Sequence, residues 1–523
     1  MGRNIRMSQD LNDSLVKITK GAGIAFAGVL AALFFGFISR VLVARYRTEA
    51  DYGVYSLAFS ILGICATLAS LGLRNGATRS IAHARGKNDI ERVQKLIPAS
   101  VQFTLIASVS LAIIVFLTSD IIAAKIFYDA ALAFPLKIFA LGIPFFTLLH
   151  IFPSIFRGFG DVKPTVYFRD ILRPLLFPLF LLPVVLLNLP FTGVFYALLA
   201  SLVISCAAVI IYTVKRLPSP IGFSTRLSGN PVAKELLVFS LPLLGVAALQ
   251  LIIAWTDTLM LGGLKSSADV GLYNAAHPLA NFITSPLNAM ILIYMPVASG
   301  LYAQGSMPEM RKNFSTLTKW LCVATLPLFL ILFLFPETVL GFLFGANYAS
   351  AATALRILSL GFIISNFLGP NGATLVAMGE VRFVMWSTLA SAVLNIGLNI
   401  ALIPPLGIEG AAIASVAAIV CGNLIRCWKL YSLARAQPLS KNLVKATLAS
   451  LALVFLFQFI FGNLVTVAWW MLPLLFILYY GIYGLAILFT RSFDKEDIAM
   501  LLAIEKRAGV NLSFMKKILR RFL

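Results

Sequence analysis

The sequence contains little charge for its length. Only 12% of its 523 residues are charged, whereas 60% are hydrophobic. A soluble domain has about 25% charged and about 45–50% apolar residues. This scarcity of charge excludes an ordinary soluble protein and indicates an integral membrane protein.

Residues suited to catalysis, metal binding or disulfide formation are also scarce. The five cysteines lie in or beside apolar runs, and the three histidines form no metal-binding spacing. The sequence has no HExxH motif, no GxxxxGKS/T motif and no loop long enough to form a soluble catalytic domain. We therefore predict that the protein is not an enzyme, that it needs no cofactor or metal, and that it has no ATP site.

Apolar runs of about 20 residues recur from one end of the chain to the other, and none of them alternates as a strand does. We expect an all-α polytopic membrane protein with about 14 transmembrane helices. The predicted spans are 21–44, 53–73, 96–118, 131–153, 172–188, 192–214, 236–263, 271–303, 317–336, 353–377, 383–403, 408–427, 445–462 and 467–490.

The positive charges behind the net charge of +21 lie mainly on one predicted side of the membrane. With both termini in the cytoplasm, all but seven of the 42 lysines and arginines fall on the cytoplasmic side, as the positive-inside rule requires. We interpret the excess as orientation and as attraction to anionic membrane lipids, not as nucleic-acid binding. The protein is thus predicted to be a multi-pass protein of the cell (cytoplasmic) membrane. The seven outward cations are Arg40, Arg45, Arg47, Lys125, Lys137, Lys265 and Arg356.

Three short motifs occur twice, in the same order and at a nearly constant separation. The pairs are TEADYGVY (48–55) with SSADVGLY (266–273), LKI (136–138) with LRI (355–357), and GDVK (160–163) with GEVR (379–382). The repetition indicates a duplication of six spans that keep the same orientation. We predict two six-helix lobes, related by a pseudo-two-fold axis along the membrane normal, with a central cavity between them and two extra C-terminal helices.

This organisation predicts six parts of the chain. They are a cytoplasmic N-terminal segment (1–20), an N-lobe with spans 1–6 (21–214), a cytoplasmic linker (215–235), a C-lobe with spans 7–12 (236–430), spans 13 and 14 (445–490), and a basic amphipathic cytoplasmic tail (491–523). The tail has an apolar and a basic face, so we expect it to lie on the inner leaflet.

Charged residues within spans are candidates for function, because burying charge in hydrocarbon is costly. Superposing the repeats places Arg40 on span 1 and Asp257 on span 7 at similar depths in opposite lobes. We predict that Arg40, together with Arg45 and Arg47, binds an anionic group. Asp257 is predicted to be its counter-charge or a site for a coupling cation. The alternatives are that Arg40 snorkels to the outer interface and that Asp257 pairs structurally.

Four other cations are weaker candidates for substrate binding. Arg74 and Arg79 lie at the inner end of span 2, where they are either positive-inside charges or contacts to a phosphate. Lys137 and Arg356 occupy equivalent outer positions in the two repeats. Each either snorkels to the interface or belongs to a transport pathway.

Two spans carry a stripe of polar residues at helical spacing. On span 8 the stripe comprises Asn274, His277, Asn281, Ser285 and Asn288, and on span 11 it comprises Ser387, Ser391, Asn395 and Asn399. Such a face either lines a wet cavity or hydrogen-bonds to another helix. We expect the span 8 stripe to line the cavity, with Asn281 and Asn288 contacting substrate, and the span 11 stripe to pack against a helix.

The first repeated motif has the spacing of a capping box in both copies, from Thr48 to Asp51 and from Ser266 to Asp269. In a capping box the side chain of the first residue accepts a hydrogen bond from the backbone three positions later. We therefore interpret these pairs as helix starts after short outer turns.

Four stretches together resemble the lipid-linked oligosaccharide flippases, a polysaccharide biosynthesis branch of the multidrug/oligosaccharidyl-lipid/polysaccharide exporter superfamily. They are ISRVLVARYRTEADYGVYSLA, SLGLRNGATRSIA, WTDTLMLGGLKSSADVGLYNAA and PETVLGFLFGANYASAATALRILSLG. The resemblance covers about residues 14–435. It implies a two-lobe, alternating-access transporter of a polyprenyl-(di)phosphate-linked glycan, in which Arg40, Arg74, Arg79 and Asp257 match charged positions of the family.

The residues and the resemblance agree on a flippase that moves the glycan-lipid from the inner to the outer leaflet. Its energy would come from a proton or sodium gradient, or from consumption of the glycan outside. An alternative is a cation-coupled multidrug or metabolite exporter of the same fold, although a cationic vestibule would repel cationic drugs. A membrane polymerase or glycosyltransferase is a further alternative, but it would need a large outer loop.

Overall fold

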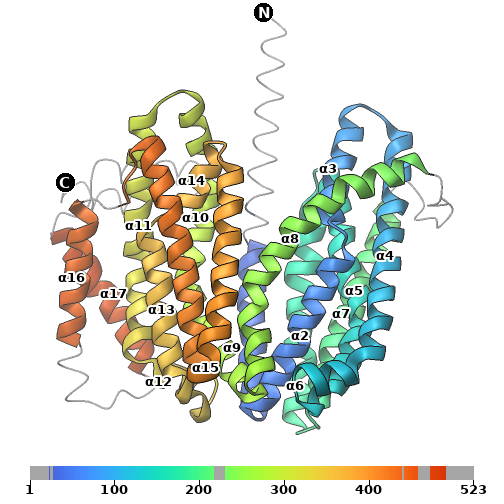
Figure 1. Ribbon diagram of the computed structural model, residues 1–523, viewed down its shortest axis with the longest axis horizontal. Helices are drawn as coiled ribbons and strands as arrows, with labels where there is room; N and C mark the ends of the chain where they lie inside the picture. The colour runs from blue at the N-terminus through green and yellow to red at the C-terminus, as the bar shows by residue number, and fades with distance from the viewer. Residues whose placement is uncertain (1–22, 24–26, 217–229, 439–440, 458–470, 490–523) are drawn as a thin grey trace, which may run out of the picture. The chain divides into compact units, whose positions relative to one another are not determined.

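The computed structural model describes residue 23 and residues 27–216, 230–438, 441–457 and 471–489, and every regular element within these ranges is a helix (Figure 1). The predictions for residues 1–20, for most of the 215–235 linker and for the 491–523 tail lie outside the described residues. The all-helical fold class predicted from the sequence is confirmed for the described part of the chain.

The helices follow one another with short connections. After a first helix over Ala27–Tyr46 come α2 (Glu49–Ala69), α3 (Leu73–Gly86), α4 (Ile90–Ile121), α5 (Ala133–Gly158), α6 (Arg173–Leu186), α7 (Thr192–Arg216), α8 (Pro231–Leu264) and α9 (Ser267–Asn281). They are followed by α10 (Ser285–Ala303), α11 (Met307–Leu334), α12 (Pro336–Leu343), α13 (Ala352–Phe367), α14 (Asn371–Ala377), α15 (Val381–Ala434), α16 (Lys441–Phe457) and α17 (Met471–Phe489).

Helices cover the main part of each of the fourteen predicted spans within the described residues. Nine helical stretches there are long and apolar enough to cross a membrane by length and composition. The number is lower than fourteen because some spans are broken or joined. Span 8 is divided into α9 and α10 by the short 3₁₀ turn Phe282–Thr284, whereas spans 11 and 12 are joined within α15.

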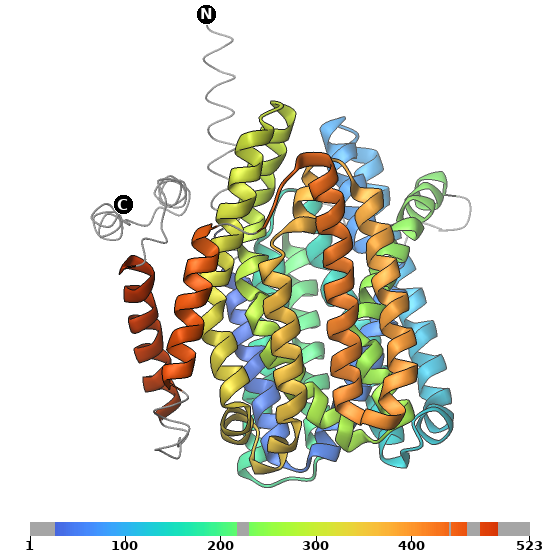
Figure 2. The same ribbon diagram turned by 60° about the vertical axis from the view of Figure 1, so that its left-hand side comes forward.

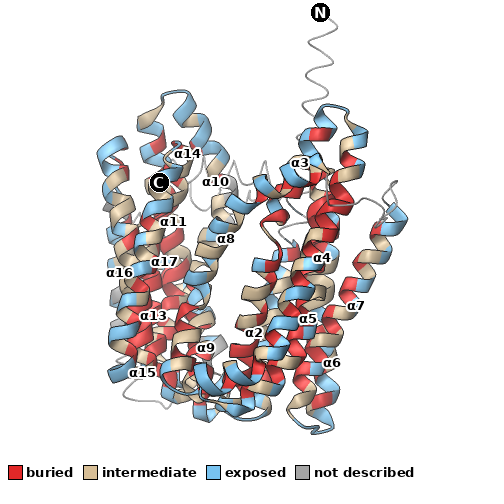
Figure 3. Ribbon diagram, turned by 45° about the vertical axis from the view of Figure 1, so that its right-hand side comes forward, coloured by how far each residue is buried: buried red, intermediate tan, exposed pale blue. Residues whose placement is uncertain are grey.

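The exposed side chains of the helices are mainly apolar, as expected for a protein surrounded by lipid. On α4, for example, Ile106, Ile113 and Leu117 are all more than half exposed. On α5 most side chains are buried instead, because this helix packs against α2, α3, α4 and α7 (Figure 3). The chain is therefore an integral membrane protein with many spans.

The contacts divide the chain into two compact units, residues 1–271 and 272–523. In the first unit, α8 packs against α2, α3 and α4. The sequence repeat instead places the boundary between the two halves at 215–235, and so assigns α8 to the second half. This assignment concerns the duplication and stays a prediction.

Glycines let α8 approach the turn between α2 and α3. Gly72 has a φ of +73°, and a Cβ atom there would lie 2.1 Å from the carbonyl oxygen of Ser240. A Cβ atom on Gly76, one turn later, would lie 1.9 Å from Oγ of Ser240. Only glycine provides both the left-handed conformation and the space at position 72. This close approach holds the start of α3 against α8. The start of α3 carries Arg74 and Arg79.

In the second unit, α15 consists of two antiparallel helices that meet at Gly407, whose φ is +58° (Figure 2). Arg426 donates hydrogen bonds to the hydroxyl groups of Ser387 (2.9 Å) and Thr388 (2.8 Å) across this hairpin. Asn395 donates to Ser415 Oγ at 3.4 Å. The polar stripe of span 11 therefore packs against the following helix, which confirms the expectation from the sequence.

The helix starts predicted in the repeated motif are confirmed. Thr48 caps α2 in a capping box, in which the backbone N–H of Asp51 donates to Thr48 Oγ1 at 3.2 Å and the Asp51 carboxylate accepts from Thr48. At α9 the backbone N–H of Asp269 donates to Ser266 Oγ at 3.2 Å, and Ser266 donates to the Asp269 carboxylate at 2.6 Å.

Candidate functional site

The outer end of the first helix carries the predicted cations Arg40, Arg45 and Arg47, and all three are exposed. Arg47 donates a hydrogen bond to the carbonyl oxygen of Leu189 at 3.2 Å, and Tyr46 donates to the carbonyl oxygen of Val184 at 2.9 Å. These bonds tie the helix end to the end of α6 and the turn after it. Arg40 stays exposed and lies within electrostatic range of the buried hydroxyl groups of two tyrosines of α2, Tyr52 and Tyr55.

Asp257, the predicted counter-charge, is buried on α8 with only 6% of its surface exposed. The adjacent Trp255 packs edge-to-face against Phe59 of α2, with the ring centroids 6.2 Å apart. Asp257 thus belongs to the part of α8 that packs into the first unit. A buried carboxylate in a span fits either of the two roles considered for it, a cation site or a structural partner.

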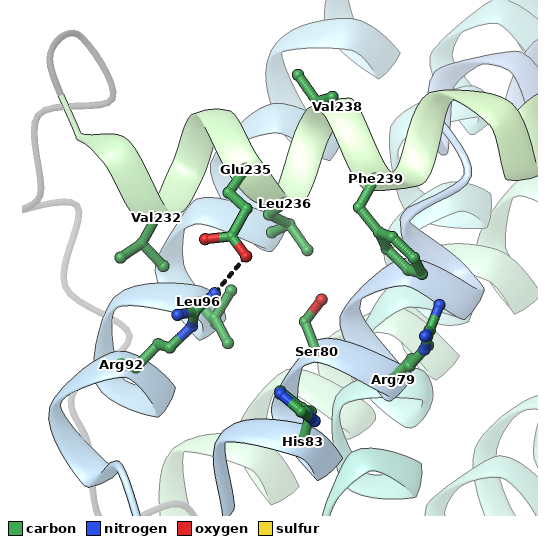
Figure 4. A pocket seen from close by; sticks show the side chains of 10 residues that line it. All are labelled: Arg79, Ser80, His83, Arg92, Leu96, Val232, Glu235, Leu236, Val238 and Phe239. Atoms are coloured by element: carbon green, nitrogen blue, oxygen red, sulfur yellow. Dashed lines mark hydrogen bonds and ion pairs between the residues drawn. The ribbon is translucent and has the colours of Figure 1, made fainter. Parts of the chain in front are cut away.

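Arg79 lies in a basic pocket of about 380 Å³ between α3, α4 and α8. Figure 4 shows its side chain beside Phe239, and the guanidinium lies 4.6 Å from the centroid of that ring. An ion pair between Arg92 and Glu235, 2.5 Å long, joins α4 to α8 at the other side of the pocket (Figure 4). His83 also lines it. The pocket lies at the predicted inner end of the unit, where a phosphate group would find positive charge.

Arg74 belongs to a second and more buried basic cluster that was not predicted as a site. Arg157 at the end of α5 donates a long hydrogen bond (3.4 Å) to the carbonyl oxygen of Arg74. Arg74 also interacts electrostatically with Arg169, which lies on the π-helical segment Thr165–Leu172. Arg173 follows at the start of α6. We call Arg74, Arg157, Arg169 and Arg173 the arginine cluster.

A single carboxylate pairs with the arginine cluster within the described part of the chain. Asp170, which is 7% exposed, accepts from Nε of Arg169 at 2.6 Å and from its Nη2 at 3.1 Å. The guanidinium of Arg173 lies over the rings of Phe146 (5.2 Å) and Phe59 (5.8 Å). The cluster therefore carries more positive than negative charge, and its partly buried guanidinium groups suit an anion.

Sequence reasoning missed Arg157, Arg169 and Arg173 because it counted them as positive-inside charges of a cytoplasmic loop. Arg169 and Arg173 are one helical turn apart, but Arg157 and Arg74 lie on other helices. Only the packing of α5 against α3 and against the π-helical segment that leads into α6 brings them together with Arg74.

The two repeat-equivalent cations, Lys137 and Arg356, each form an ion pair within their own unit. Lys137 Nζ lies 2.9 Å from an oxygen of Asp120, and Arg356 lies 2.9 Å from an oxygen of Glu337. All four side chains are more than a third exposed. These pairs support a structural interpretation, and a role in the pathway remains a proposal.

The polar stripe of span 8 is interrupted in the second unit by the 3₁₀ turn Phe282–Thr284. Thr284 donates to the side-chain oxygen of Asn281 at 2.9 Å, and Asn281 and Asn288 are both exposed. His277, in contrast, packs against the ring of Phe362 on α13, with the centroids 5.8 Å apart. Asn281 and Asn288 are thus exposed on the surface of the second unit, while His277 takes part in helix packing.

Comparison with known proteins decides the family. The family model described as "Polysaccharide biosynthesis protein" matches residues 18–301, more than half of the chain. The chain belongs to this family. A second model, MatE, matches residues 242–401. The membership confirms the resemblance stated from the sequence motifs.

Two curated relatives and one solved structure show how far the likeness extends. Stage V sporulation protein B of Bacillus subtilis is 22% identical over 78% of this chain and 82% of its own length. The probable low-salt glycan biosynthesis flippase Agl15 of Haloferax volcanii is 24% identical over 79% of this chain and 81% of its own length. A structure of the lipid II flippase MurJ, in an inward closed conformation, matches with a TM-score of 0.69 and 14% identity, over 88% of this chain and 97% of MurJ.

The fold of this chain is therefore that of the multidrug/oligosaccharidyl-lipid/polysaccharide exporter superfamily. The protein is a membrane transporter of this superfamily, in the branch that includes flippases.

Proposed function

We propose that this protein flips a polyprenyl-(di)phosphate-linked oligosaccharide from the inner to the outer leaflet of the cell membrane, for the biosynthesis of a surface polysaccharide or glycan. It works by alternating access, with both termini in the cytoplasm. The observation that carries the proposal is the excess of arginine in the first unit, where the arginine cluster has one carboxylate partner among the residues that the structure describes. A lipid-linked diphosphate needs such cations, because its charge must be neutralised as it leaves the aqueous interface.

The site residues predicted from the sequence have separate roles in this proposal. Arg74 and Arg79 contact the phosphates at the inner side, and Arg40, Arg45 and Arg47 receive the anionic group at the outer side. Asn281 and Asn288 contact the sugars, and Lys137 and Arg356 lie along the outer part of the pathway. Asp257 binds the coupling ion, a proton or Na⁺, or serves as the counter-charge of Arg40.

A leaflet assay tests this function. The purified protein is reconstituted in liposomes with a fluorescently labelled polyprenyl-diphosphate oligosaccharide, and an impermeant quencher reports the amount on the outer leaflet. We expect protein-dependent exchange of the lipid across the bilayer, strongly reduced in Arg40→Ala. Lys125→Ala is the matched control, because Lys125 is also an exposed cation on the predicted outer side and has no assigned role.

The second candidate function is a cation-coupled multidrug or metabolite exporter. It is favoured by the match of the MatE model to residues 242–401. In the same liposomes this exporter would move a cationic dye down an imposed proton or sodium gradient and would leave the glycan-lipid in place. That result would contradict the flippase proposal. Wild-type exchange by Arg40→Ala would contradict only the role of Arg40.

A further inference from the structure

We propose that the arginine cluster is a diphosphate-binding site within the first unit, and that the Asp170 carboxylate competes with the diphosphate for Arg169. The inference rests on the proposed flippase function and deepens it, because it names the residues that capture the headgroup at the inner side. Three of these residues, Arg157, Arg169 and Arg173, were not among the candidates drawn from the sequence.

The first argument is convergence. The cluster combines side chains from the start of α3, the end of α5, the π-helical segment and the start of α6. Of these elements, α5 contacts α3 and the π-helical segment, and that segment continues into α6. His150 lies two turns before Arg157 on α5 and interacts electrostatically with Arg74, Arg169 and Arg173. Its Nδ1 lies 2.7 Å from the carbonyl oxygen of Phe146, which fixes the ring. Arg74, Arg169 and Arg173 therefore lie near His150, and Arg157 joins them through its hydrogen bond to the carbonyl oxygen of Arg74.

The second argument is the charge balance. Asp170 neutralises Arg169 through a bidentate pair. Within the described residues, no carboxylate oxygen lies within 4.0 Å of a nitrogen of Arg74, Arg157 or Arg173. Cations gathered in one partly buried cluster repel one another, so the arrangement favours a ligand with two or more negative charges. A diphosphate meets this requirement, whereas a neutral sugar or a single carboxylate does not.

The third argument concerns hydrogen bonds. Nε of Arg157 and Nε of Arg173 are buried and donate to no acceptor among the described residues. Buried donors without a partner are rare, because each loses its bonds to water without a replacement. Guanidinium groups bind phosphate oxygens in pairs of parallel hydrogen bonds, and a diphosphate offers several such oxygens. The unused donors match this ligand.

The local backbone gives the fourth argument. Arg169 and Asp170 lie on the π-helical segment Thr165–Leu172, and π-helical turns frequently occur at functional sites. The ion pair thus joins two consecutive residues of this segment. When a diphosphate replaces the carboxylate, Arg169 exchanges one anionic partner for another.

The position in the membrane suits the first step of transport. All four arginines lie at the predicted cytoplasmic ends of spans 2, 4 and 5, the side on which the lipid-linked substrate starts. The rings of Phe59 and Phe146 help to hold the Arg173 guanidinium in place. The shared chemistry of the ligand is the diphosphate, which could be free or attached to a lipid.

Binding to the purified full-length protein in detergent tests the site. The probes are inorganic pyrophosphate, geranyl diphosphate and geraniol, measured by isothermal titration. We expect geranyl diphosphate to bind and geraniol not to bind. Arg157→Gln and Arg173→Gln should each weaken binding by about tenfold or more, as expected for the loss of charge-assisted hydrogen bonds. Arg216→Gln is the matched control, since Arg216 is an exposed arginine that lies 5.9 Å from the ring of Tyr212.

Asp170→Asn distinguishes a binding site from a merely structural cluster. Competition predicts that this variant binds diphosphate more tightly than wild type, because the anionic rival is removed. If the cluster were only structural, the loss of its carboxylate would leave diphosphate binding undetectable or unchanged. Should Arg173→Gln fail to fold, Arg173→Lys keeps the charge but loses the paired donors, and a folded protein with weakened binding supports the site.

The leaflet assay separates this inference from the proposed function. If wild type flips the glycan-lipid, and folded Arg157→Gln and Arg173→Gln proteins bind diphosphate and flip it normally, the site is refuted and the flippase stands. If the cluster binds diphosphate but wild type moves no glycan-lipid, the site stands and the flippase fails. If the protein binds inorganic pyrophosphate but not geranyl diphosphate, the site takes the free anion, and its role in headgroup capture is overturned.

Discussion

Gly53 and Gly271 are equivalent positions of the repeated motif, and their backbones lie in direct contact. A Cβ atom on Gly53 would lie 1.6 Å from the carbonyl oxygen of Ser267, and one on Gly271 would lie 1.9 Å from that of Glu49. Glu49 and Ser267 are themselves equivalent in the repeat. The start of α2 and the start of α9 therefore meet in a symmetrical crossing that leaves no room for a side chain.

The crossing predicts that Gly53→Ala destabilises the protein. Alanine normally favours a helix over glycine by about 0.5–1 kcal/mol. Here the methyl group would collide with backbone, and overpacking of this kind costs about 1–3 kcal/mol. We expect a lower melting temperature in detergent, measured by intrinsic fluorescence. Gly63→Ala on the same helix is the control, because its nearest neighbour would be Trp255 at an ordinary 3.8 Å. Equal melting temperatures of the two variants would refute the close contact.

The Lys137–Asp120 pair predicts a small effect on stability and a reversible effect on transport. Partly exposed ion pairs contribute about 0–1 kcal/mol, so Lys137→Ala should melt close to wild type. If Lys137 serves only its partner, the double variant Lys137→Asp/Asp120→Lys should restore flipping that either single variant loses. Failure of the double variant, with normal insertion, would assign Lys137 to the transport pathway. Melting in detergent measures the stability of Lys137→Ala, and the leaflet assay measures flipping by the single and double variants.

Asp257→Asn tests the coupling role proposed for the buried carboxylate of α8. Asparagine keeps the shape but removes the charge that would bind a proton or Na⁺. We expect the variant to insert normally and to lose the dependence of flipping on an imposed ion gradient. Thr258→Val, next to it, controls for a general disturbance of α8. If flipping by Asp257→Asn still follows the gradient, the ion binds elsewhere.

Arg426→Ala is predicted to loosen the α15 hairpin. The guanidinium bridges Ser387 and Thr388 across it, and hydrogen bonds that involve a charged group contribute about 1.5–3 kcal/mol. We expect a lower melting temperature, whereas Arg382→Ala, which removes an exposed arginine of the same element, should have little effect. A melting temperature of Arg426→Ala equal to that of Arg382→Ala would show that the bridge is not stabilising.

Hydrophobic runs and local motifs predicted the helices well, because the length of a span and the chemistry of a cap depend on neighbouring residues. Thr48 and Asp51 determine their cap within one turn of chain. The repeat motifs also identified Gly53 and Gly271 as equivalent, although they gave no reason to expect that the two touch. The break of span 8 at Phe282–Thr284 was missed, since hydropathy does not distinguish one long helix from two shorter ones.

Apolar runs and repeated motifs were enough to predict a helical membrane transporter with a duplicated core and to indicate its family. Which charges act together depends on the packing of the helices. Arg157, Arg169 and Arg173 look like ordinary cytoplasmic cations in the sequence, and Lys137 looks like a free one. Packing brings Arg157 and Arg169 to Arg74, places Arg173 near the same histidine, His150, and pairs Lys137 with Asp120. Electrostatic interactions depend on distance in space, and no local pattern encodes it.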